Sequence, residues 1–152
     1  MGARQSWQAG ARSRRRRTLI ILDANIVAAC VLGEKTSPLM ALLHEGGAQF
    51  AICEPQLREA DRVLTGKLGQ DPRRVSLALD SVKVFARALD AESYAAFEAT
   101  ARARLHERAQ PDWPVLAAAL AYDGAIWSND RDFFGVGVPV WSSRNVRFAA
   151  AT

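Results

Sequence analysis

The fold is decided by the stretch Thr18-Leu19-Ile20-Ile21-Leu22-Asp23-Ala24-Asn25. Its first five residues are apolar or β-branched, which predicts a short strand over 18–22 that is buried on both faces, as in a parallel sheet. Asp23 follows at the point where a helix can begin, and aspartate is a natural N-cap. The stretch therefore predicts the first strand–helix unit of an α/β domain.

The rest of the chain continues this alternation of strands and helices. Pro139 predicts that the last strand lies at a sheet edge, because proline cannot donate to a ladder on that side. Ser93 is the predicted cap of the helix that it opens. Residues 82–85 fit either type of element. The predicted strands are 18–22, 49–52, 125–128 and 138–141, and the predicted helices are 25–32, 38–44, 55–68, 72–79, 93–108 and 115–121.

The basic residues are unevenly distributed along the 152-residue chain, whose net charge is +4. Residues 1–17 contain six arginines and no acidic residue, which leaves 14 basic against 16 acidic residues, or a net charge of −2, in 18–152. We expect 1–17 to be a disordered basic tail. It either contacts nucleic-acid phosphates or is a solubilising segment or a start codon assigned too early.

Residues 18–152 have the length and hydrophobic content of one domain with one ordinary core. Cys30 and Cys53 are far apart, so we expect buried thiols in a reducing compartment and no disulfide framework. The chain lacks the roughly 18 consecutive apolar residues of a membrane span. These features predict a cytoplasmic protein that does not associate with membranes.

Acidic residues occur in four segments where a predicted strand ends or a helix begins. They are Asp23, the carboxylates between Glu54 and Asp61, Asp112, and the pair Asp130 and Asp132. Because the carboxyl ends of parallel strands meet at one edge of a sheet, these side chains would form a site for a hard divalent cation. Taken singly, each of Asp23, Asp112 and Asp130 is better explained as a helix cap, but capping does not explain why so many of these positions hold aspartate at one sheet edge.

Two of these segments carry a specific resemblance. Residues 112–125 read Asp-Trp-Pro-Val-Leu-Ala-Ala-Ala-Leu-Ala-Tyr-Asp-Gly-Ala, and residues 126–133 read Ile-Trp-Ser-Asn-Asp-Arg-Asp-Phe. These two segments, together with Ile21-Leu22-Asp23-Ala24-Asn25 and the predicted helix around Glu59, make the chain resemble the PIN-domain nucleases, and in particular the VapC-like ribonuclease toxins. The resemblance covers 18–148. Periodicity alone puts Asp61 nearer the apolar stripe of its helix than Glu59, so Asp61 remains the alternative for the second acidic position.

The resemblance implies a three-layer α/β/α fold with a central parallel sheet and metal-dependent cleavage of RNA. It implies Mg²⁺ or Mn²⁺ as the cofactor, and an antitoxin protein as a partner beside the RNA substrate. A homodimer is a further option. The implied catalytic residues are Asp23, Glu59, Asp112 and Asp130, of which Asp23, Asp112 and Asp130 would bind the metal, and the supporting residues are Asn25, Ser128 and Asp132.

Two other functions remain open on the sequence. Asp23-Ala24-Asn25 after a strand also resembles the first motif of haloacid dehalogenase-like phosphatases, although Asn25 stands where that family has a second aspartate. Alternatively, a catalytically inactive PIN-like domain could bind RNA without cleaving it. Clustered like charges give a binding module no advantage, which favours the enzyme.

Overall fold

The computed structural model describes residues 18–33 and 35–151, and the predicted basic tail, 1–17, lies outside them. Its centre is a five-stranded sheet with the order β3-β2-β1-β4-β5, in which every neighbouring pair is parallel. The α/β prediction is confirmed. The strands are β1 (Leu19–Leu22), β2 (Gln49–Cys53), β3 (Ala86–Leu89), β4 (Ala125–Trp127) and β5 (Val140–Trp141).

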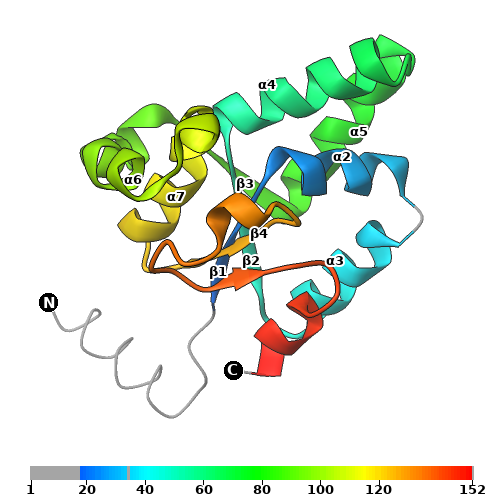
Figure 1. Cartoon of the computed structure of the whole chain (residues 1–152). Coiled ribbons are helices and arrows are strands. Elements are labelled where there is room, and N and C mark those ends of the chain that lie inside the picture. The colour runs from blue at the N-terminus through cyan, green and yellow to red at the C-terminus, as the bar shows by residue number, and fades with distance from the viewer. Residues whose placement is uncertain (1–17, 34, 152) are drawn as a thin grey trace, which may run out of the picture.

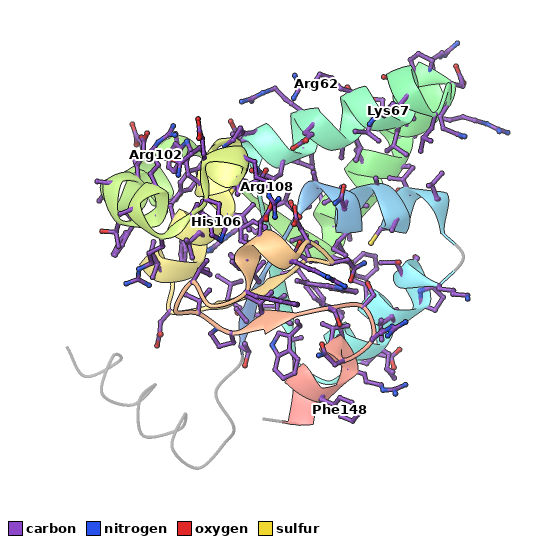
Figure 2. The ribbon with its side chains drawn as sticks, in the orientation of Figure 1. Arg62, Lys67, Arg102, His106, Arg108 and Phe148 are labelled. Carbon is purple, nitrogen blue, oxygen red and sulfur yellow. The ribbon has the colours of Figure 1, made fainter. Side chains whose placement is uncertain are left out.

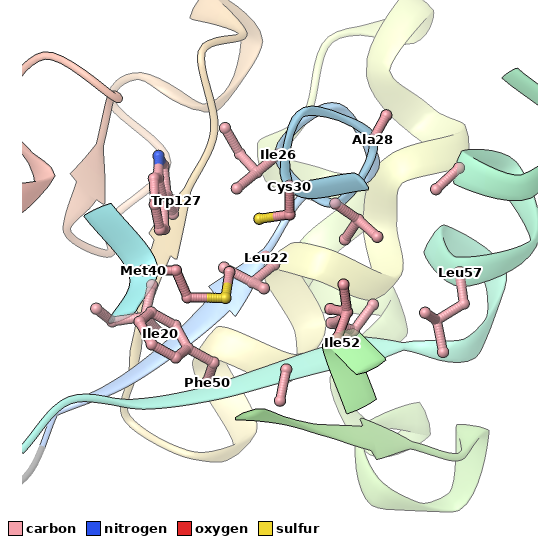
Figure 3. Packing of buried hydrophobic residues seen from close by; sticks show 14 of the residues in the cluster. Ile20, Leu22, Ile26, Ala28, Cys30, Met40, Phe50, Ile52, Leu57 and Trp127 are labelled. Atoms are coloured by element: carbon pink, nitrogen blue, oxygen red, sulfur yellow. The ribbon is translucent and has the colours of Figure 1, made fainter. Parts of the chain in front are cut away.

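Alternation along β1 divides the core into two clusters, one on each face of the sheet. Ile20 and Leu22 pack into one cluster and Ile21 into the other, and all three are fully buried. A strand with both faces buried reads as a continuous apolar run, which is why its sequence was recognisable. Figure 3 shows the first cluster, with Phe50, Ile52 and Trp127 beside Ile20 and Leu22.

Helices cover both faces, so the three-layer prediction is also confirmed. The first cluster is completed by α2 (Ala24–Leu32), α3 (Thr36–Glu45), α4 (Glu54–Arg62) and α5 (Pro72–Phe85). The second is completed by α6 (Glu98–Arg104) and α7 (Trp113–Ala121). Figure 1 shows α6 and α7 on one side of the sheet and α2, α3 and α5 on the other. In the described residues no single helix is long and apolar enough to cross a membrane, and α2 and α3 reach that length only as a pair bent by 105°.

The region between β3 and α7 differs from its prediction. The helix expected over 93–108 is two 3₁₀ turns, η2 (Ala91–Ser93) and η3 (Ala95–Phe97), followed by the short α6. Asp90 is the cap, since its carboxylate accepts hydrogen bonds from the backbone and the hydroxyl of Ser93. Ser93 was therefore wrong as a cap, because a stronger acceptor stands three residues before it.

Strand β3 was missed, and residues 82–85 belong to α5. The predicted helix over 55–68 ends earlier as an α-helix and continues as a π-helical turn, η1 (Val63–Lys67), closed by the bond from Leu68 N to Val63 O. Cys30 and Cys53 are free and buried as expected. Burial raises the pKa of each thiol to about 12.

Gly124 is required by the close approach of the α7–β4 connection to β1. A Cβ atom at this position would lie 2.6 Å from the carbonyl oxygen of Leu19, which is backbone of the central strand and cannot swing away. Gly66, in contrast, has open space around the corresponding position. The first glycine is therefore a packing requirement and the second is not.

We predict that Gly124→Ala lowers the free energy of unfolding by about 1–3 kcal/mol, because β1 or β4 must shift to admit the methyl group. Gly66→Ala, the matched control, should be neutral or slightly stabilising, since alanine has the higher helix propensity. Urea unfolding of the two variants measures both effects. Equal stability of the two variants would contradict the close approach.

Candidate metal and nuclease site

Asp23 and Ser128 lie side by side at the carboxyl ends of two neighbouring strands, β1 and β4. β2, which follows β1 in the sequence, pairs with one side of β1, and β4 pairs with the other side, so the strand order reverses at β1. In open α/β sheets, ligand sites lie outside the carboxyl ends of the strands at such a switch point. Ser128 Oγ donates to Asp23 Oδ2 at 2.7 Å, and Ala24 N donates to Asp23 Oδ1 at 2.8 Å. Asp23 thus caps α2 and also lies in the site, so the two explanations of this residue are compatible.

The same hydroxyl connects Asp23 to Asp130. Asp130 N donates to Ser128 Oγ at 3.0 Å, and Asp130 Oδ1 accepts from Asp132 N at 2.9 Å. The second bond caps the 3₁₀ turn η5 (Arg131–Phe133). Ser128 is fully buried, so a side chain that water cannot reach fixes the backbone of one site residue against the carboxylate of another.

Asp112 approaches the site from the other layer. It ends the 3₁₀ segment η4 (Glu107–Asp112) and immediately precedes α7, but its side chain makes no capping bond. The capping explanation of Asp112 is therefore wrong. Burial, which is the largest cause, and the charges of Asp23, Glu59, Asp130 and Asp132 together raise the pKa of Asp112 from 3.8 to about 7.

Glu59 belongs to this group and Asp61 does not. Glu59 is half-buried on α4, and its charge contributes to the raised pKa of both Asp23 and Asp112. Asp61 is exposed on the opposite flank of the same helix. The apolar stripe did not distinguish these flanks, because the buried face of α4 also includes a polar residue, Gln56.

Gln56 is the site neighbour that the sequence did not reveal. It lies one helical turn before Glu59, is 1% exposed, and its Oε1 atom has no hydrogen-bond partner in the described part of the chain. A glutamine on a helix surface is normally solvated, so no pattern marked it. An inward-facing amide extends the polar side of α4 toward the acidic residues.

The remaining two predicted supporting residues lie differently. Asn25 is exposed on α2, and within residues 18–33 and 35–151 its side chain forms no hydrogen bond to a carboxylate. Asp132 pairs with Arg108, whose Nη2 lies 2.6 Å from Asp132 Oδ1. The hydrogen bond and charge of Arg108 hold the pKa of Asp132 below its usual range.

The carboxylates are the type of ligand that a hard divalent cation prefers, although in this structure they are too far apart to bind one together. All donors are oxygens, which Mg²⁺ and Mn²⁺ prefer. The Asp112 carboxylate makes no hydrogen bond or ion pair to any described residue, so both of its oxygens are free to bind. Among the described residues, no three His, Cys, Asp or Glu side chains are close enough together to hold an ion as they stand.

A PIN-domain family model matches residues 21–151, which is most of the chain and runs from the second half of β1 to the last turn, η6 (Val146–Ala151). The chain belongs to the PIN-domain family. The predicted resemblance is thus confirmed, and the match goes against the haloacid dehalogenase alternative. A comparison with curated proteins finds no match.

Solved structures share the fold of this PIN domain at low sequence identity. VapBC2 from Rickettsia felis, bound to a DNA fragment from their promoter, has a chain that aligns with a TM-score of 0.65 and 14% identity over 82% of this chain and 98% of that one. FitAcB from Neisseria gonorrhoeae aligns with a TM-score of 0.61 and 17% identity over 82% and 98%. A toxin–antitoxin complex from Klebsiella pneumoniae gives 0.59 and 21% over 82% and 97%.

The raised pKa of Asp112 predicts how the metal-free protein responds to pH. Between about pH 4 and pH 7 the folded protein keeps a proton on Asp112 that the unfolded chain has lost, so the free energy of unfolding falls as pH rises through this window. Asp112→Asn removes this cost. The variant should be more stable than the wild type by about 1–2 kcal/mol near pH 8, a value discounted for solvent screening of a half-buried group.

Urea unfolding in chelator across this pH range measures the difference. When the series is extended to about pH 3, the two proteins should become almost equally stable, because Asp112 is then largely protonated in both the folded and the unfolded state. A difference in stability that does not change with pH would contradict the raised pKa of Asp112.

Proposed function

We propose that this PIN domain is an endoribonuclease that requires Mg²⁺ or Mn²⁺ and is the toxin of a toxin–antitoxin pair. The observation that carries the proposal is the hydrogen-bonded group of Asp23, Ser128 and Asp130 at the switch point of the sheet, and the raised pKa of the half-buried Asp112 reflects the charges of Asp23, Glu59 and Asp130 as well as burial. Perturbed carboxylates in such a position are typical of functional sites. The structurally similar proteins include toxin–antitoxin complexes, which supports the biological assignment.

Each site residue has a chemical task in this proposal. Asp23, Asp112 and Asp130 hold the divalent ion, directly or through water, and Glu59 orients the attacking water. A bound ion of this kind neutralises charge on the scissile phosphate and lowers the pKa of water. Ser128 keeps the carboxylate of Asp23 in one orientation through its 2.7 Å hydrogen bond. Asn25 remains a predicted supporting residue through its position two residues after Asp23.

Charge neutralisation also suggests how an antitoxin would act. Four carboxylates near one another attract a cation, and an arginine side chain of a partner could occupy that position with bidentate hydrogen bonds. An antitoxin segment laid over the site would then replace the charge of the metal and exclude RNA at the same time.

The alternative of an inactive RNA-binding module makes a different use of the same residues. Clustered carboxylates repel RNA phosphates when no cation is present. A module that only bound RNA would therefore be hindered by Asp23, Glu59, Asp112 and Asp130, which favours catalysis.

We predict that the purified chain cleaves RNA with Mg²⁺ or Mn²⁺ and stops in excess chelator. Glu59→Gln should reduce the rate by at least about 100-fold, the size expected for a residue that orients or activates water. Asp61→Asn is the matched control on the same helix, and it should retain nearly full activity because Asp61 is exposed and lies outside the site.

Gel-resolved cleavage of a labelled RNA measures both rates. Full activity in chelator would overturn the metal requirement. Loss of activity in Asp61→Asn with retention in Glu59→Gln would move the second acidic role to Asp61. A chain that binds RNA but cleaves none under any metal would favour the inactive module.

A further inference from the structure

An ion pair at the edge of the site connects the two segments that carry Asp112 and Asp130. Arg108 Nε and Nη2 both donate to Asp132 Oδ1, at 2.9 and 2.6 Å. Arg108 belongs to the six-residue segment η4 that ends at Asp112, so the two residues lie about 8 Å apart along that segment. Asp132 N in turn donates to Asp130 Oδ1. The guanidinium is therefore held next to the carboxylate cluster.

The exposure of the two partners is unequal. The Asp132 side chain is 12% exposed and that of Arg108 is 77% exposed. Ion pairs open to solvent contribute little to stability, so this pair stabilises the fold only weakly. Asp132 is the less exposed member and is held by the hydrogen bond from its backbone to Asp130, so it orients the exposed arginine.

Arg108 retains hydrogen-bonding capacity toward solvent. A guanidinium has five N–H donors, and Asp132 takes two of them. The other donors have no partner among the described residues. Planar guanidinium groups with free paired donors bind phosphate oxygens in a bidentate manner.

Neighbouring arginines on the same layer are already engaged. Arg102 donates to Glu98 at 2.7 Å and lies over the ring of Trp113, and Arg104 donates to the carbonyl of Val136 at 2.9 Å. In Figure 2, Arg108 lies toward the middle of the view, between α7 and the segment after β4, whereas Arg102 and Arg62 lie toward the outside. Arg108 is thus the arginine of this group that combines free donors with a position beside Asp130 and Asp132.

We propose that Arg108, oriented by Asp132, binds a phosphate of the RNA next to the phosphate that is cleaved. The inference rests on the proposed function and assigns a second anion-binding position to it. A nuclease site lined by carboxylates repels its own substrate, and a fixed cation at its edge lowers that barrier for the strand that must enter. Asp132 has the role of a positioning residue for Arg108.

The test compares RNA binding by full-length variants in chelator, where the RNA is not cut. Arg108→Ala should weaken binding of a fluorescent single-stranded RNA about tenfold, the loss expected for charge-assisted hydrogen bonds. It should also reduce the slope of log affinity against log salt by about 0.7, the value for one phosphate contact. Arg108→Lys should restore the slope and only part of the affinity, because lysine keeps the charge without the paired donors.

Arg147→Ala is the matched control, since it removes one positive charge from η6 at the far end of the molecule, where Arg147 lies over Phe148. It should leave the slope unchanged. Asp132→Asn should weaken binding less than Arg108→Ala, and the double variant should bind no more weakly than Arg108→Ala alone, because Asp132 acts through Arg108.

Steady-state cleavage and Mn²⁺ binding without RNA complete the test. Most of the decrease in kcat/KM of Arg108→Ala should come from a higher KM. Calorimetry should give the same Mn²⁺ affinity for this variant as for the wild type. An unchanged salt slope would overturn the phosphate contact. So would a loss confined to kcat together with weaker Mn²⁺ binding, because Arg108 would then stabilise the structure of the site and not bind RNA. Wild-type protein that binds RNA without cleaving it would refute the nuclease proposal and leave the binding result for Arg108 to be judged separately. Wild-type protein that does neither would overturn both.

Discussion

The hydroxyl of Ser128 is the group on which the arrangement of the site depends. It is fully buried, donates to the carboxylate of Asp23 and accepts from the backbone of Asp130. A buried hydroxyl without partners is costly, so these two bonds are strongly favoured once β4 has paired with β1. The pairing of β1 with β4 therefore also sets the positions of Asp23 and Asp130 relative to each other.

Opposing electrostatic effects meet at this edge of the sheet. Burial raises the pKa of Asp23, whereas the hydrogen bonds from Ser128 and Ala24 lower it. Asp112 receives no such hydrogen bond from the described residues, and its pKa rises to about 7. Both residues directly precede helices, whose N-termini favour negative charge. The backbone thus offsets part of the repulsion, and a cation would offset the rest.

The sequence predicted the parts of the structure that have strong local signals. The apolar run of β1 and the capping position of Asp23 lie where they were expected, because burial on both faces and capping leave clear patterns. Strand β3 was missed because Ala86-Arg87-Ala88-Leu89 contains no β-branched residue and follows α5 without a turn. Only its pairing with β2 makes it a strand.

The choice between Glu59 and Asp61 shows a second limit. A helical wheel ranks positions by their distance from the apolar stripe, but an active site can lie along one flank of that stripe. Gln56, buried and polar, extends the inward face toward Glu59, and no rule based on hydrophobicity would count it. Tertiary structure, and not local pattern, shows that Glu59 is half-buried and that Asp61 is exposed.

The 105-residue separation between Asp23 and Ser128 has a consequence for the order of synthesis. When β1, β2 and β3 have been synthesised, only three adjacent strands of the sheet exist, because β4 and β5 come later in the sequence. Domains form co-translationally from the N-terminus, and contacts between distant segments come late. The carboxylate cluster is therefore complete only after Asp130 has been synthesised, and products that end before β4 would lack both Ser128 and Asp130.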